Sequence, residues 1–290
     1  MRQLGTLGVW YPVDRLDGAG IRRLLRTVEE LGYSALWYPE AIGYESLSLA
    51  SFMLANTTRL IIGSSIANIY GRDPFTARRG LRTLSGLYDD RFILGLGVSH
   101  APLVERVRGH VYDKPVPAMR RYLDGVYEKP SNAGEWPVVI AALGPLMLKL
   151  AAERTAGAVP YNVTPEHTRE ARAALGADKL LVVEQKVCLQ SDPVAARGLA
   201  RRELDRYMTL TNYRNNWLRL GFTEADLADR GSDRFIDAMV LWGDPATIAS
   251  GLRAHLEAGA TQVCIQPIHA DADIETRDRT LTALADLWAS

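Results

Sequence analysis

Eight short apolar segments recur along the chain, and segments with helical periodicity separate them. The apolar segments lie at residues 4–11, 35–38, 60–66, 92–98, 138–142, 158–161, 180–189 and 263–268. Such runs are typical of strands buried on both faces, as in a parallel sheet covered by helices. Between the first two, Ile21, Leu24, Leu25 and Val28 have helical spacing and precede Gly32, a common helix terminator. The alternation predicts an α/β fold, a closed (β/α)8 TIM barrel.

A doubly wound open sheet is the alternative architecture. Its dinucleotide-binding version carries Gly-x-Gly-x-x-Gly after the first strand, whereas the first segment here continues into Trp10-Tyr11-Pro12. This difference favours the barrel. A long charged helical stretch at about residues 193–238 follows the seventh segment, so we expect an extra helical insertion within a single domain of residues 1–290.

The composition excludes several kinds of partner. The chain has 290 residues, and its 34 Lys and Arg residues balance 34 Asp and Glu residues, which leaves no net charge to attract nucleic acid or an anionic membrane. No apolar run approaches the roughly 18 residues of a membrane span. The N-terminus lacks the pattern of a signal peptide. Cys188 and Cys264 lie in apolar strands and are expected to be buried free thiols, which indicates a cytoplasmic protein.

Candidate site residues follow from the barrel, because loops at the C-terminal ends of its strands build the active site. The side chains at those positions are mostly aromatic, small or amide-bearing: Trp10, Tyr11, Tyr38, Glu40, residues 65–72, Ser99, His100, residues 141–144, Tyr161, Asn162, Gln266 and His269. This set suits a flat conjugated ligand. No His, Asp or Glu cluster has the spacing of metal ligands, and no lysine is evident at the rim for a Schiff base.

The fourth apolar segment ends in Gly95-Leu-Gly97-Val-Ser-His100. Glycines within a strand let another group approach the backbone closely. For His100 a catalytic role and a structural role are about equally supported, since imidazole exchanges protons near neutral pH. The following segment ends in Ala141-Ala-Leu-Gly-Pro145, which fits either a tight turn or a phosphate site at a helix N-terminus.

Charged and titratable residues elsewhere leave several interpretations open. Glu40 is a candidate general base, ligand anchor or partner of Arg72, while Arg72 and Asp73 could instead pair with each other or cap the next helix. His110, His167 and His255 fall in loop or helix positions, where we expect them to face solvent.

Several of these segments together resemble the luciferase-like superfamily of flavin- and deazaflavin-dependent oxidoreductases. The resemblance rests on residues 30–40, ELGYSALWYPE, residues 61–74, IIGSSIANIYGRDP, and residues 91–98, RFILGLGV. Residues 141–145, AALGP, and the later segments GDPATI and AGATQV agree as well. The match spans nearly the whole chain in the expected order.

The resemblance implies a barrel that holds a flavin or coenzyme F420, a 5-deazaflavin, at its C-terminal face. In the F420-dependent branch, strand three has a bulge with a non-proline cis peptide behind the ring, here the Ser65–Ile66 bond. The turn formed by Ala142, Leu143 and Gly144 would bind the cofactor phosphate. Ala41 and His100 replace residues that some F420-dependent relatives carry, and Asp73 replaces the usual histidine, so proton transfer is the part of the resemblance that departs most.

On this basis we expect an F420-dependent oxidoreductase that transfers hydride between the deazaflavin and a small organic substrate. Ser65, Ile66 and Asn68 would support the ring, Trp10 and Tyr38 would line it, and Gly97 and Ser99 would also contact the cofactor. His100 is the leading acid–base candidate and Glu40 the second. The alternatives are an FMN-dependent monooxygenase and a non-catalytic cofactor-binding barrel. The family also implies a homodimer, and we expect no metal, nucleic acid or membrane partner.

Overall fold

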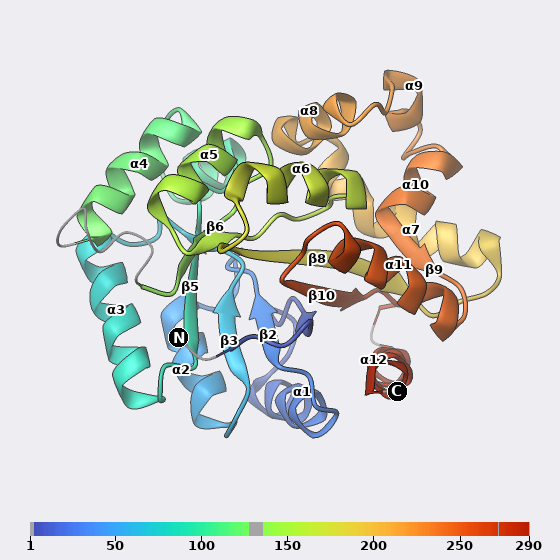
Figure 1. Cartoon of the computed structure of the whole chain (residues 1–290), viewed down its shortest axis with the longest axis horizontal. Coiled ribbons are helices and arrows are strands. Elements are labelled where there is room, and N and C mark those ends of the chain that lie inside the picture. The colour runs from blue at the N-terminus through green and yellow to red at the C-terminus, as the bar shows by residue number, and fades with distance from the viewer. Residues whose placement is uncertain (1–2, 128–135, 272, 290) are drawn as a thin grey trace.

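Eight parallel strands close into a barrel in the computed structural model, which describes residues 3–127, 136–271 and 273–289 (Figure 1). The strands are β1 (Leu7–Trp10), β2 (Ala35–Tyr38), β3 (Ile61–Ser64), β5 (Phe92–Gly97), β6 (Val138–Ile140), β7 (Gly157–Ala158), β8 (Leu180–Cys188) and β10 (Gln262–Pro267). Each pairs in parallel with the next, and β10 pairs with both β8 and β1, which closes the ring. The predicted TIM barrel is confirmed.

Helices between the strands cover the outside of the barrel. They are α1 (Gly18–Glu30), α2 (Ser46–Ala55), α3 (Pro74–Leu87), α4 (Pro115–Val126), α5 (Pro145–Arg154), α6 (Pro165–Leu175), α11 (Pro245–Glu257) and α12 (Ile274–Ala289). In α1 the residues at helical spacing, such as Ile21 and Leu24, are buried, and Asp17 caps the helix by accepting a hydrogen bond from the Gly20 N–H. None of the helices in the described ranges is long and apolar enough to span a membrane.

Successive residues of each strand point to opposite sides of the barrel wall. The outward residues, such as Leu36 and Ile62, belong to the large apolar core beneath the helices. The inward residues, such as Trp37, Ile61 and Val182, form a smaller cluster inside the barrel. This period of two decides which strand residues can reach a site at the mouth.

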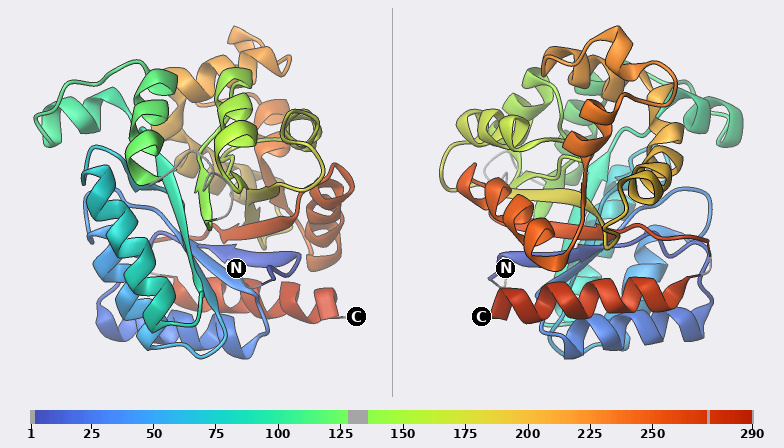
Figure 2. Two further views of the ribbon diagram at one scale, coloured as in Figure 1. Left: turned by 60° about the vertical axis from the view of Figure 1, so that its left-hand side comes forward. Right: turned by 90° about the vertical axis from the view of Figure 1, so that its right-hand side faces the viewer.

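The insertion after β8 consists of α7 (Pro193–Met208), α8 (Thr211–Arg219), α9 (Glu224–Leu227), α10 (Asp233–Met239) and β9 (Val240–Trp242). Its helices gather at one end of the molecule, away from α1 and α12 (Figures 1 and 2). They have an apolar core of their own, in which the rings of Trp217 and Phe235 lie 4.8 Å apart. The predicted helical insertion is confirmed. The sequence did not predict β9, which pairs with the end of β8.

Strand three differs from the continuous segment expected at residues 60–66. It ends at Ser64, and a separate two-residue strand, β4 (Ala67–Asn68), pairs with β5. The interruption is a bulge at Ser65 and Ile66. A π-helix, η1 (Leu103–Val107), follows β5 and was also not expected.

Two of the three histidines expected at the surface are buried, so that prediction was wrong for His167 and His255. His255 Nε2 lies 2.9 Å from Gln185 Oε1 and its Nδ1 lies 2.8 Å from Thr168 Oγ1, both inside the core between β8, α6 and α11. His110 is exposed, as predicted. Burial lowers the pKa of His255 to about 4, because the charged imidazolium would lose its hydration.

The buried His255 predicts a loss of stability in mild acid. The unfolded chain takes up a proton near pH 6.5 and the folded chain only near pH 4, so stability present at pH 7 falls by up to about 3 kcal/mol across this interval. Thermal midpoints measured from pH 7.5 to 4 should fall less steeply in His255→Gln than in the wild type. His110→Gln is the control and should keep the wild-type slope. Equal slopes for all three proteins would contradict the assignment.

Candidate functional site

The C-terminal ends of the strands gather the residues that the sequence singled out. Ser65 and Ile66 of the bulge, Ser99 and His100 after β5, and Leu143 and Gly144 after β6 are all partly exposed there. Tyr161, after β7, is partly exposed as well and lies in the interior cluster with Ile66 and Trp10. These residues define the barrel mouth.

The bulge is fixed by hydrogen bonds to both neighbouring strands. The Ser65 N–H donates to the Tyr38 carbonyl at 2.7 Å, and the Ile66 carbonyl accepts from the Glu40 N–H at 3.2 Å. Ser64 Oγ donates to the Gly95 carbonyl and accepts from the Gly95 N–H, both at 2.9 Å. The Ser65–Ile66 peptide bond is cis, as the resemblance implied.

The glycines of β5 allow the bulge to approach. A Cβ on Gly95 would lie 1.9 Å from the Ser64 carbonyl oxygen, and a Cβ on Gly97 would lie 2.3 Å from Cγ1 of Ile66. The group that approaches the strand is therefore the bulge itself. Gly97, expected to contact the cofactor, is covered on this side by Ile66.

Glu40 is held by the loop that follows the bulge. Its two carboxylate oxygens accept from the Arg72 guanidinium at 2.5 and 2.9 Å, and one of them also accepts from the Asn68 N–H at 2.7 Å. Arg108 lies 3.9 Å away. Of the alternatives for Glu40, the structure shows the pairing with Arg72, while Asp73 caps α3. This arrangement positions Asn68 beside the bulge.

Asn68 is completely buried at the end of β4. Its Oδ1 accepts from the Tyr70 N–H at 2.9 Å, whereas its Nδ2 makes no hydrogen bond within the described residues. A buried amide N–H without an acceptor is costly, so an acceptor atom that reached it would be bound favourably.

Trp10 and Tyr38, both expected to line the cofactor ring, point in different directions. Trp10 faces the barrel interior, where its ring centroid lies 4.9 Å from that of Tyr161. Tyr38 faces outward into the core beneath α2, and its hydroxyl donates to the Ser46 carbonyl at 2.7 Å. The structure does not bring the Tyr38 side chain to the mouth, because Tyr38 directly follows the inward-facing Trp37 and side chains alternate along a strand.

His100 lies at the mouth, half-buried between β5 and the insertion. Its ring centroid lies 5.8 Å from that of Tyr213, and its side chain hydrogen-bonds Asn212. Burial lowers the pKa of His100 below its usual 6.5, although the bond to Asn212 acts in the opposite direction. Ser99, with a φ of 57°, turns the chain towards His100, and its carbonyl accepts from the Tyr112 hydroxyl at 3.2 Å.

The turn formed by Ala142, Leu143 and Gly144 leads into α5, with Gly144 as its N-cap. The three N–H groups of this turn donate no hydrogen bond within the described part of the chain. His167 contacts the Leu143 carbonyl from behind, at 2.8 Å from its Nε2. Free amides at a helix N-terminus suit an anionic group such as a phosphate.

Sequence reasoning found no lysine at the rim and did not single out a buried lysine within β8. Lys186, two residues before the end of β8, is 1% exposed and faces the barrel interior with Glu184. The signal was the pair of charged residues two positions apart within an otherwise apolar segment, since a period of two places both on one face of a strand.

The insertion contributes further side chains to the mouth. Tyr207 and Tyr213 contact Tyr161, and the hydroxyls of Tyr207 and Tyr161 lie 2.8 Å apart. Tyr161 also donates to Gln266 of β10 at 2.8 Å. These residues lie far from one another in the sequence, so their meeting could not be inferred without the structure.

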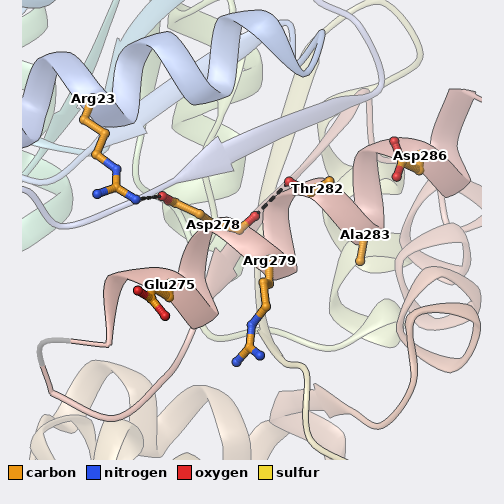
Figure 3. Close-up of a pocket in the computed structure, with 7 residues that line it drawn as sticks. All are labelled: Arg23, Glu275, Asp278, Arg279, Thr282, Ala283 and Asp286. Atoms are coloured by element: carbon orange, nitrogen blue, oxygen red, sulfur yellow. Dashed lines mark hydrogen bonds and ion pairs between the residues drawn. The ribbon is translucent and has the colours of Figure 1, made fainter.

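A separate groove of about 600 Å³ lies on the outer surface between α1 and α12 (Figure 3). It is lined by Arg23, Glu275, Asp278, Arg279, Thr282, Ala283 and Asp286, and Arg23 and Asp278 form an ion pair across it at 2.8 Å. It is outside the barrel and of mixed charge, and we do not assign a ligand to it. Within the described ranges, no group of three or more His, Cys, Asp or Glu side chains could hold a metal ion.

Two relatives cover different shares of the chain. A protein of Mycobacterium tuberculosis that carries the name coenzyme F420-dependent oxidoreductase is 31% identical over 53% of this chain and 42% of its own length. The match therefore spans less than half of that relative. The 5,10-methylenetetrahydromethanopterin reductase of Archaeoglobus fulgidus is 24% identical over 82% of this chain and 86% of its own.

Among solved structures with the same fold, one contains an F420 adduct and another contains FMN. An F420-dependent secondary alcohol dehydrogenase with an F420-acetone adduct has a TM-score of 0.73 at 13% identity, covering 97% of this chain and 99% of its own. The FMN-bound oxygenating constituent of 3,6-diketocamphane monooxygenase from Pseudomonas putida has a TM-score of 0.71 at 13% identity, covering 98% and 97%.

A family model described as luciferase-like monooxygenase matches residues 6–262, which is most of the chain. The resemblance inferred from the motifs, and with it the expectation of an oxidoreductase, is thereby confirmed. The chain belongs to the luciferase-like monooxygenase family.

Proposed function

We propose that the protein is an F420-dependent oxidoreductase acting on a small organic substrate. The observation that carries the proposal is the bulge at Ser65 and Ile66, two partly exposed residues on one side of the barrel mouth. A relative and a solved structure that are both named for F420 support the choice of cofactor. When bound, the deazaflavin would supply hydride chemistry, and the protein would supply orientation and electrostatics.

The residues at the mouth fit such a group. Ser65 and Ile66 present a surface against which a planar ring can lie, and the free Nδ2 of the buried Asn68 is a donor for a ring oxygen or nitrogen. The amides of Ala142, Leu143 and Gly144 would hold the phosphate. Trp10 would border the ring from the interior. Gly97 would act indirectly, by admitting the bulge.

His100 is the acid–base residue that we propose at the mouth. Its lowered pKa keeps the imidazole neutral at pH 7, which is the form that accepts a proton from an alcohol. We assign Glu40 a positioning role, because both of its oxygens are already hydrogen-bonded to the loop beside the bulge. A homodimer, implied by the resemblance, and a cytoplasmic location, indicated by the two free cysteines, are further expectations.

An FMN-dependent monooxygenase is the second candidate, since FMN-bound members share the fold. Titration of the purified chain with F420 and with FMN, followed by cofactor fluorescence, separates the two. We expect F420 to bind at least tenfold more tightly. Selective binding of FMN would refute the proposal in favour of the monooxygenase, and binding of neither would refute both.

The phosphate site can be tested by Gly144→Ala. Gly144 has a φ of −85°, and an added Cβ would meet no protein atom within 4 Å, so the fold should tolerate it and the thermal midpoint should stay unchanged. The methyl group would instead hinder an anion approaching the amides. We expect F420 to bind several-fold more weakly, with no change for the phosphate-free deazaflavin riboside. If the substitution weakened the binding of F420 and of the riboside equally, the phosphate would not be bound by these amides.

The role of His100 predicts a difference between two variants in the oxidation of cyclohexanol by F420. In the wild type the rate should fall as the pH drops through the lowered pKa of His100, because the imidazole then becomes protonated. His100→Gln should lose about 100-fold in kcat/KM together with this pH dependence. Glu40→Gln should lower the thermal midpoint and keep the pH dependence. A wild-type pH profile in His100→Gln would contradict the assignment.

A further inference from the structure

The inward-facing residues differ between the two halves of the barrel. The strands β2, β3, β5 and β6 contribute apolar residues and glycine, such as Trp37, Gly63 and Val139. In contrast, β8 and β10 contribute the polar Glu184, Lys186, Gln262 and Gln266 besides the apolar Val182 and Cys264, all buried. Barrel interiors are usually filled by branched apolar side chains, so this polar half is unusual. Three strands separate β8 from β3 on either side of the ring, so the polar half faces the bulge across the barrel.

Lys186 and Glu184 form a buried ion pair in this half. Lys186 Nζ donates to Glu184 Oε1 at 3.1 Å and to Asn162 Oδ1 at 2.6 Å, and the two charged side chains are 1% and 3% exposed. Burial lowers the pKa of Lys186 and raises that of Glu184. A buried ion pair seldom stabilises a fold more than apolar side chains of the same size would, so stability alone does not account for this one.

Two N–H donors near Tyr161 have no hydrogen-bond acceptor among the described residues. The ammonium group of Lys186 has a third N–H besides the two it donates, and it lies 3.9 Å from the centroid of the Tyr161 ring. Asn162 Nδ2 and Trp10 Nε1 are buried without a hydrogen bond. Buried donors of this kind are rare in folded proteins, and an acceptor atom from a ligand would satisfy them.

The charges around these donors are already balanced. Glu184 neutralises Lys186, and Glu203 of the insertion pairs with Arg206 at 2.5 Å. An anionic ligand would leave an uncompensated negative charge in a buried place, which is strongly unfavourable. A neutral carbonyl or hydroxyl oxygen would satisfy the donors without adding charge.

The cover over Lys186 is formed by side chains that solvent reaches. Tyr161 and Tyr207 lie over the ammonium group and are both partly exposed. Their contact depends on the bond between the two hydroxyls and on the bonds from Tyr161 to Gln266 and from Gln266 to Glu203. Rotation of these rings would uncover Lys186 without disturbing the barrel wall.

We propose that Lys186 receives the oxygen of a neutral carbonyl or alcohol substrate, together with Asn162 and Trp10, on the side of the mouth opposite the bulge. The inference rests on the proposed function, because it places the substrate between the cofactor ring and β8. A carbonyl oxygen of the cofactor is the other possible source of the acceptor, and the experiment separates the two.

The test uses the double variant Lys186→Met/Glu184→Gln, which removes both buried charges and leaves neither one unpaired. Lys179→Met is the matched control, since Lys179 lies at the opposite end of β8 and donates to the Thr155 carbonyl at 2.6 Å. Circular dichroism and thermal midpoints establish that each variant folds. Cyclohexanone is the neutral probe and cyclohexanecarboxylate its anionic counterpart, and calorimetry measures their binding to the chain with and without F420.

The wild type and Lys179→Met should bind cyclohexanone with equal affinity and bind it more tightly than cyclohexanecarboxylate. The double variant should bind cyclohexanone at least tenfold more weakly while its affinity for F420 stays within twofold. Reduction of cyclohexanone by reduced F420 should also fall, mainly through a higher KM.

Four results would overturn the proposal: no binding of cyclohexanone to the wild type, unchanged binding in the double variant, tighter binding of the carboxylate, or weaker F420 binding with ketone binding retained. The last result would assign the donors to the cofactor. Failure of the proposed function is a separate result, namely that the wild type does not bind F420 although the ketone data stand.

Discussion

The contact between the bulge and β5 is the constraint on which the barrel mouth depends. The Ser64 carbonyl lies directly against Gly95, and the Ile66 side chain lies against Gly97, at distances that exclude a Cβ on either glycine. Because Gly95 and Gly97 have no side chains, the chain can bulge away after β3 and then pair with β5 again as β4. The same displacement brings the Asn68 N–H to Glu40, and Glu40 in turn holds Arg72. One local steric condition thus arranges an entire side of the mouth.

On the other side of the mouth, formed by β8, β10 and the insertion, the arrangement of charges is the main constraint. Its ionic side chains occur in pairs of opposite sign, and the polar atoms left over are donors. A wall of this kind discriminates against charged molecules, since any added charge would lack a partner in a place with little water. Specificity at the mouth would then depend on the number of unpaired donors and less on the shape of the aromatic cover.

The sequence predicted the fold well, because each strand is buried on both faces and therefore appears as an apolar run. Gly63, Ser64 and Ser65 interrupt one such run, and the resemblance implied the bulge that lies there. It failed where the outcome depends on tertiary contacts. Tyr38 lies at a strand end, but its direction follows from the register of β2. Lys186 and His255 are buried because other elements enclose and hydrogen-bond them. The spacing of Glu184 and Lys186 places both on one face of β8, but no local pattern shows that this face is enclosed.

The short strand β9 has a consequence for how this barrel can vary. It pairs with Lys186, Val187 and Cys188 of β8, so the chain returns to the barrel beside the residues where it left. The Gly243 N–H donates to the Cys188 carbonyl at 3.3 Å and closes this junction. The insertion between β8 and β9 therefore begins and ends at neighbouring positions. Its length and sequence can change while the barrel strands keep their geometry. Relatives with the same ring could in this way acquire different substrates by exchanging one contiguous piece of chain.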